Sequence, residues 1–113
     1  MALTRDFKDT VKARAQRDPA FRRGLFEEAI EAFLSNDTET GKLLLRDYVN
    51  ATVGFEKLGE ELDKSPKSLM RMLSAQGNPR ADNLFAVVGH LRRKEGADFV
   101  LRSETPLASP AHS

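Results

Sequence analysis

Apolar residues recur every three or four positions along most of the chain, which is the spacing of a helix with one buried face. This pattern predicts five or six helices, over residues 4–15, 19–35, 38–52, a pair of short helices within 54–79, and 80–94. Asp18-Pro19 is typical of a helix start, and Gly96 is typical of a helix end. The sequence therefore predicts an all-α bundle.

The chain after the last helix has a different pattern. Residues 98–102, DFVLR, alternate as a short β-strand does, with Phe99 and Leu101 on one side. A lone strand lacks a ladder partner in a helical chain, so we expect it to pair with another copy or another protein. The polar, proline-containing segment 103–113 is expected to be disordered.

Composition limits the classes of function. The 113 residues fit one globular domain, and the absence of cysteine excludes disulfides and thiolate chemistry. No apolar run approaches the ~20 residues that a membrane-spanning helix needs. The N-terminal segment alternates charge signs and lacks the apolar core of a signal peptide. We expect a cytoplasmic protein without a membrane partner.

Charge is distributed unevenly although the net charge is only +1. Residues 1–53 carry nine basic and nine acidic side chains, whereas residues 54–63 have a net charge of −3. Residues 64–94 carry seven basic side chains and one acidic side chain, a net charge of +6. Such a basic segment is typical of proteins that bind a polyanion, and a solvated basic surface is the alternative.

The short helix pair lies in LGEELDKSPKSLMRMLSAQGNP, residues 58–79, and its pattern is that of a helix-turn-helix. The motif needs an apolar pair in each helix, which Leu58 and Leu62 provide in the first helix and Leu69 and Met72 in the second. It also needs a small residue where the helices cross, here Gly59. The turn needs a residue that tolerates left-handed geometry, here Asp63, and the second helix needs a cap, here Ser65. Lys64 departs from the pattern, because an aliphatic residue is usual there. Plain core packing of two short helices is the alternative.

The second helix of the pair would then present a polar face. If Leu69 and Met72 point inward, the outer face carries Lys67, Arg71 and Ser74. Lysine and arginine can donate to guanine O6 and N7, and serine hydroxyls can bind phosphate oxygens. The predicted DNA-binding residues are Ser65, Lys67, Ser68, Arg71, Ser74 and Arg80. A solvated side chain is the preferred interpretation for Lys64, Arg92, Arg93 and Lys94.

Residues LGEELDKSPKSLMRMLSAQGNPRADNLFAVVGHL resemble helix-turn-helix antitoxins of the addiction-module antidote family, which are Xre/Cro-like regulators. The matching features are a serine-led second helix, the segment Gly77-Asn78-Pro79, and the apolar pattern from Leu84 to Leu91. The upstream stretch LLLRDYVNATVGF is also similar, so that the resemblance covers about residues 19–102.

This resemblance implies a lambda-repressor-like fold, a homodimer on double-stranded operator DNA, and repression of the protein's own operon in a bacterial cytoplasm. It also implies a partner toxin of the RelE/ParE superfamily. It adds Pro66 and Asn78 to the predicted DNA-binding residues. The expected DNA-binding domain is residues 54–96, which follow an N-terminal segment, 1–18, and amphipathic helices, 19–53. Asp63-Lys64 replaces the usual glycine-aliphatic turn.

Two other classes of function stay open. The chain could be a protein-interaction module, in which segments 19–52 and 98–102 bind a toxin or another partner and the helix-turn-helix is only a scaffold. An enzyme is disfavoured, because the only histidines are His90 and His112 and no carboxylate pair, phosphate-binding glycine loop or metal-ligand spacing accompanies them. We expect no catalytic residue, metal or cofactor.

Overall fold

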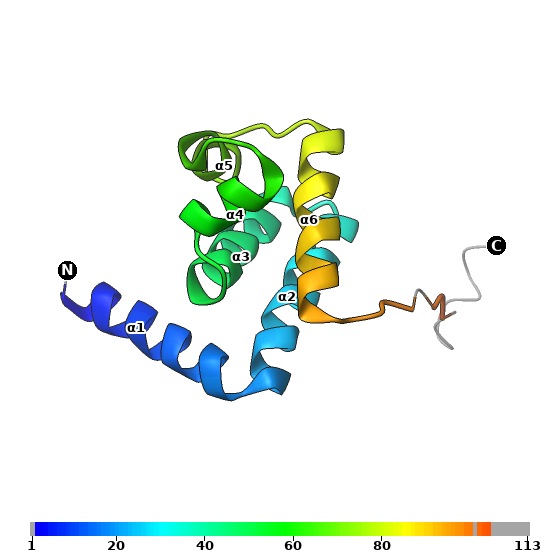
Figure 1. Ribbon diagram of the computed structural model, residues 1–113. Helices are drawn as coiled ribbons and strands as arrows, with labels where there is room; N and C mark the ends of the chain where they lie inside the picture. The colour runs from blue at the N-terminus through cyan, green and yellow to red at the C-terminus, as the bar shows by residue number, and fades with distance from the viewer. Residues whose placement is uncertain (1, 101, 105–113) are drawn as a thin grey trace.

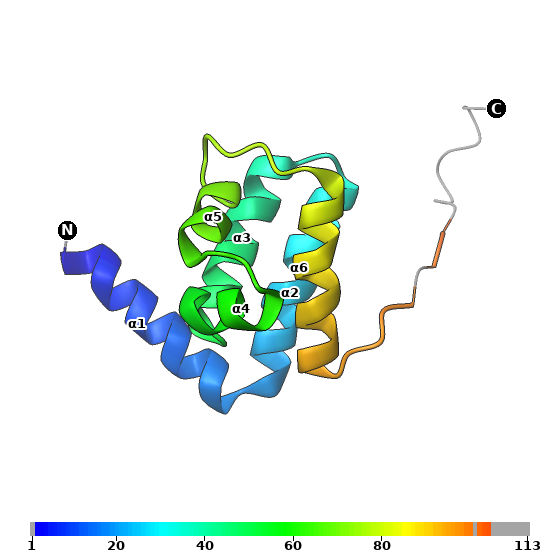
Figure 2. The ribbon, with the colours of Figure 1, turned by 45° about the horizontal axis from the view of Figure 1, so that its top comes forward.

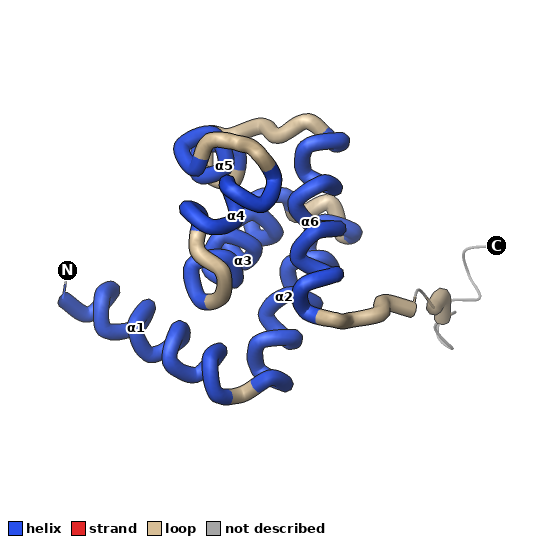
Figure 3. The backbone as a smooth tube through the Cα atoms, viewed as in Figure 1, coloured by secondary structure: helices blue, strands red, loops and turns tan. Residues whose placement is uncertain are grey.

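The computed structural model describes residues 2–100 and 102–104. The described part folds into six helices (Figures 1 and 3). They are α1 (Ala2–Arg17), α2 (Pro19–Leu34), α3 (Thr38–Ala51), α4 (Phe55–Leu62), α5 (Pro66–Met72) and α6 (Ala81–Glu95). The all-α prediction is confirmed. No helix in these residues has the length and apolar character needed to cross a membrane.

Helices α2 to α6 pack as a bundle, while α1 extends from its base (Figures 1 and 2). Helix α6 runs beside α2 in both views (Figures 1 and 2), and α4 contacts both α3 and α5. The chain turns from α1 into α2 at Asp18, whose side chain accepts a hydrogen bond from Phe21 N at 3.1 Å. Helix α1 is therefore joined to the bundle at one end.

Local capping explains why the helices begin and end where the sequence predicts. Asp37 accepts a hydrogen bond from Thr40 N at 3.2 Å and caps α3. Proline follows the cap of both α2 and α5, where its missing N–H leaves no helical hydrogen bond unmade. Helix α6 ends at Gly96, which adopts the left-handed conformation with φ of 71°.

One apolar core holds α2 to α6 together. Its fully buried large side chains are Phe26, Leu45, Val49, Leu58, Leu69, Leu73, Val87 and Leu91. Within this core Phe26 and Tyr48 stack, with their ring centroids 5.0 Å apart. Helices α4 and α5 thus share one core with α2 and α3, and the core that positions α5 extends across the bundle.

The predicted C-terminal strand is wrong for the described residues. Residues 97–100 and 102–104 have no regular secondary structure, and Leu101 lies outside the described part of the chain. Side chains hold this segment instead: the Phe99 ring packs on Phe26 at 5.4 Å between centroids, and Arg92 donates to the carbonyl oxygen of Ala97 at 3.2 Å. Without a backbone ladder partner, the alternating pattern of residues 98–102 does not produce a strand. The expected disorder from residue 105 onward lies outside the described residues.

Candidate nucleic-acid interface

The turn between α4 and α5 packs directly on Gly59. A Cβ atom at this buried glycine would lie 2.6 Å from the Lys64 carbonyl oxygen and 3.2 Å from Pro66 Cδ. Such distances leave no room for any larger residue. The prediction that Gly59 is the small residue of the crossing is confirmed.

The turn itself has the predicted geometry. Asp63 adopts the left-handed conformation, with φ of 56° and ψ of 47°, and Lys64 N donates to Gly59 O at 2.9 Å. Ser65 then caps α5, because its Oγ accepts from Ser68 N at 3.0 Å. The two serine hydroxyls also bond to each other at 2.9 Å. The chain therefore passes from α4 to α5 through the three residues 63–65.

Helix α5 has one buried face and one exposed face. Leu69 is buried, and Leu73, which follows the last helical residue, is buried beside it. Lys67 and Arg71 are exposed, as predicted. Ser74 is partly buried, and its hydroxyl donates to the Arg71 carbonyl oxygen at 2.7 Å, so it stabilises the end of the helix.

A basic cleft of about 560 Å³ opens between α5 and the start of α6. Five of the eight predicted DNA-binding residues line it: Ser65, Ser68, Arg71, Asn78 and Arg80. Lys64 also lines the cleft. Its side chain is exposed, as expected for a solvated lysine. No acidic residue lines the cleft, although Asp82 pairs with Arg80 at 3.4 Å nearby. Pro66, Lys67 and Ser74 lie outside it.

A buried lysine that the sequence analysis missed supports the loop beside this cleft. Lys42 on α3 is 5% exposed, and its Nζ donates to the carbonyl oxygens of Gly77 at 2.6 Å and Ala75 at 3.3 Å. A Cβ atom at Gly77 would overlap the Arg71 carbonyl oxygen, so the loop lies against the end of α5. The sequence signal for its burial is that Lys42 lies on the apolar face of the 38–52 helix, three residues before Leu45.

A second network was also missed, and it ties α6 to α2 and α3. Arg22 Nε donates to both carboxylate oxygens of Glu95, at 3.0 and 3.1 Å, and the Tyr48 hydroxyl donates to the same carboxylate. Burial alone would raise the pKa of Glu95, but these hydrogen bonds outweigh it, so that the pKa lies below its usual range. Burial, followed by the bond to Glu95, raises the pKa of Tyr48 and keeps its phenol protonated.

Glu61 connects α4 to α6. It bonds to His90 Nε2 at 2.7 Å and to Lys94 Nζ at 3.0 Å, and these two partners lower the pKa of the Glu61 carboxyl, His90 most. His90 is therefore a paired structural residue. Lys94 and Arg92 keep solvent-accessible side chains, as expected, but each also has partners in the fold: Lys94 bonds to Glu61, and Arg92 bonds to Ala97 and to Asp98.

Comparisons of the chain with family models, with curated proteins and with solved structures find no match. The family suggested by the sequence resemblance stays a prediction. Among the described residues, no group of three or more histidine, aspartate or glutamate side chains could hold a metal ion.

Proposed function

We propose that this protein binds double-stranded DNA sequence-specifically and regulates transcription. The observation that carries the proposal is the tight turn on Gly59, which places an exposed basic helix beside a cleft without acidic lining. In helix-turn-helix proteins the second helix enters the major groove. Helix α5 has the corresponding place in this chain.

The exposed residues supply the chemistry that DNA binding needs. Arg71 can donate two hydrogen bonds to guanine O6 and N7, and Lys67 can donate to the same edge. Lys64 and Arg80 border the cleft, where they can neutralise phosphates of the backbone. A phosphate would replace Asp82 as the partner of Arg80, whose present ion pair is exposed and weak.

The biological setting follows from the sequence resemblance. The protein would act as a homodimer whose two α5 helices enter successive major grooves about 34 Å apart. It would repress its own operon and neutralise a toxin of the RelE/ParE superfamily as an antitoxin in the bacterial cytoplasm.

The first test is a pair of arginine variants measured on DNA from immediately upstream of the gene. Arg71→Ala should weaken binding by about 1–3 kcal/mol, because its contacts to a base pair are lost. Arg93→Ala is the matched control: Arg93 is exposed on α6 and does not line the basic cleft. Equal affinity of the two variants would overturn the role of α5 in reading DNA.

A second candidate function, binding of a protein partner, has support from exposed apolar side chains on α2 and α3. Leu34 is 71% exposed and Leu43 is 47% exposed. Co-expression with the product of the neighbouring gene tests this candidate. The double variant Leu34→Ser/Leu43→Ser should lose the co-purified partner, whereas Arg71→Ala should keep it. Retention of the partner by the double variant would remove these leucines from the interface.

A further inference from the structure

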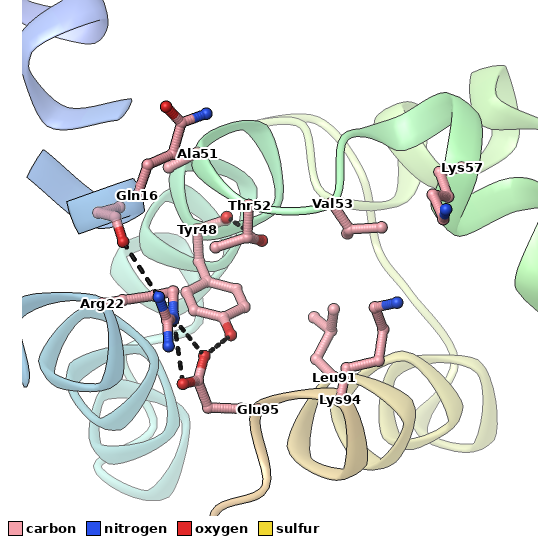
Figure 4. Close-up of a pocket in the computed structure, with 11 residues that line it drawn as sticks. Gln16, Arg22, Tyr48, Ala51, Thr52, Val53, Lys57, Leu91, Lys94 and Glu95 are labelled. Carbon is pink, nitrogen blue, oxygen red and sulfur yellow. Dashed lines mark hydrogen bonds and ion pairs between the residues drawn. The ribbon is translucent and has the colours of Figure 1, made fainter. Parts of the chain in front are cut away.

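A second cavity, of about 450 Å³, is lined by residues of α1, α2, α3, α4 and α6 and of the α3–α4 loop (Figure 4). It shares no lining residue with the basic cleft beside α5. Its size falls within the range of ~300–1,000 Å³ that is usual for small-molecule sites. The DNA-binding role proposed above does not use this cavity.

The cavity has an apolar wall and a closed polar end. Val53 and Leu91 contribute aliphatic surface to it (Figure 4). At the polar end, the Glu95 carboxylate is only 2% exposed and is bound by Arg22 and Tyr48. Since these hydrogen bonds satisfy Glu95, this end offers little negative charge to a ligand.

Two lysines, Lys57 and Lys94, bring positive charge to the other side of the cavity. The Lys57 ammonium makes no hydrogen bond or ion pair with another described residue. Lys94 also lines the cavity, and its side chain is 38% exposed while it bonds to Glu61. Arg22 is paired with Glu95 and Lys94 with Glu61, so Lys57 is the lining cation without a partner among the described residues, and Lys94 is a partly exposed second one.

We propose that this cavity binds a small organic anion. The apolar body of the ligand rests on Val53 and Leu91, and its carboxylate or sulfonate reaches Lys57 and Lys94. A few charged groups beside an apolar wall are the usual composition of a ligand site. A cationic ligand of the same shape is disfavoured by the two lysines.

Occupancy of the cavity would connect the ligand to DNA binding. The lining residues include Gln16 on α1, Lys57 on α4 and Leu91 on α6, and α4 is the first helix of the helix-turn-helix. An anion that bridges these helices changes how firmly α4 is held. This regulatory step rests on the proposed DNA-binding function, whereas the binding of the anion does not.

The test is an NMR titration of the full chain with three probes that share one ring system: indole-3-acetate, indole-3-acetamide and tryptamine. Indole-3-acetate should shift the backbone amides around Val53, Lys57 and Leu91. The neutral amide should bind about fivefold more weakly, since a partly exposed ion pair contributes up to ~1 kcal/mol. Tryptamine should bind more weakly still. Equal binding of all three probes, or shifts confined to other residues, would overturn the proposal.

Variants locate the site. Lys57→Gln should reduce the affinity for indole-3-acetate about fivefold. Arg93→Gln removes one exposed charge from α6 outside the cavity, and it should leave the affinity unchanged. Val53→Phe should block the cavity and abolish binding of the probe, while thermal unfolding shows that the variant folds. Full binding by Lys57→Gln and Val53→Phe would place the ligand elsewhere and overturn the assignment.

A parallel DNA-binding assay separates the two proposals. If the ligand-free protein does not bind DNA while the NMR shifts are intact, the proposed DNA-binding function and the regulatory step are overturned and the anion site stays in place. DNA binding without any probe-induced shift would overturn the anion site alone.

Discussion

Gly59 determines how closely α4 and the following turn approach, because a methyl group there would lie 2.6 Å from the Lys64 carbonyl oxygen. Gly59→Ala should therefore lower the free energy of unfolding by about 1–3 kcal/mol, the usual effect of overpacking. Gly24→Ala is the matched control: nothing lies within 4 Å of its added methyl group, in the interior of α2. It should raise stability by up to ~1 kcal/mol. Urea unfolding of both variants checks this prediction, and equal stability would contradict the close crossing.

Lys42 is the residue-level link between α3 and the loop that precedes α6. Lys42→Met keeps the aliphatic stem but removes the hydrogen bonds to Ala75 and Gly77. We expect a loss of about 1–3 kcal/mol in unfolding free energy. DNA affinity should fall as well, because the loop carries Asn78 and leads to Arg80. The exposed Lys12→Met on α1 serves as the control, and unfolding of the two variants at the same urea concentration would contradict this role.

At the scale of the elements, α6 is fastened to α2 and α3 through Glu95. Glu95→Gln should lower the free energy of unfolding by about 1–3 kcal/mol at neutral pH, because the bonds to Arg22 and Tyr48 lose their negative acceptor. The pKa of Glu95 is lower in the folded protein than in the unfolded chain. The stability it contributes is therefore present at neutral pH and is lost as the pH falls through the lowered pKa.

Thermal unfolding at pH 7 and near pH 3 measures this dependence. The difference between Glu95→Gln and the parent protein should shrink at the lower pH, because protonation of Glu95 makes the parent side chain neutral like the glutamine that replaces it. Glu28→Gln, an exposed change on α2, should follow the parent protein at both pH values. A difference for Glu95→Gln that stays constant across this range would contradict the ionic network.

The success of the sequence-based predictions also varies from element to element. Helix starts at Asp18 and Ser65 were predictable because a cap acts on a backbone N–H three residues away. The strand at 98–102 was wrong because its alternation reflects the packing of Phe99 on Phe26, 73 residues away in sequence. The hydrogen bond between Arg22 and Glu95 also joins residues far apart in the sequence, and no local sequence pattern predicts it.

For the whole molecule, the basic stretch of residues 64–94 becomes two separate features in the fold. Lys64, Arg71 and Arg80 border the cleft beside α5, whereas Arg92 and Lys94 bond to acidic partners near the end of α6. Charge counting along the sequence cannot make this distinction. Helical periodicity could place Lys67 and Arg71 on the exposed face, but the contribution of the α5–α6 loop to the cleft depends on Lys42 and on packing between distant segments.

The central claim is that the protein recognises a DNA sequence through α5. The most direct measurement is fluorescence anisotropy of the full chain with a duplex from immediately upstream of its gene and a shuffled duplex of the same composition, at about 150 mM salt, where surface charges are largely screened beyond ~8 Å. We predict tight binding of the upstream duplex and at least about a thousandfold weaker binding of the shuffled one. Equal affinity for the two duplexes would contradict sequence-specific recognition.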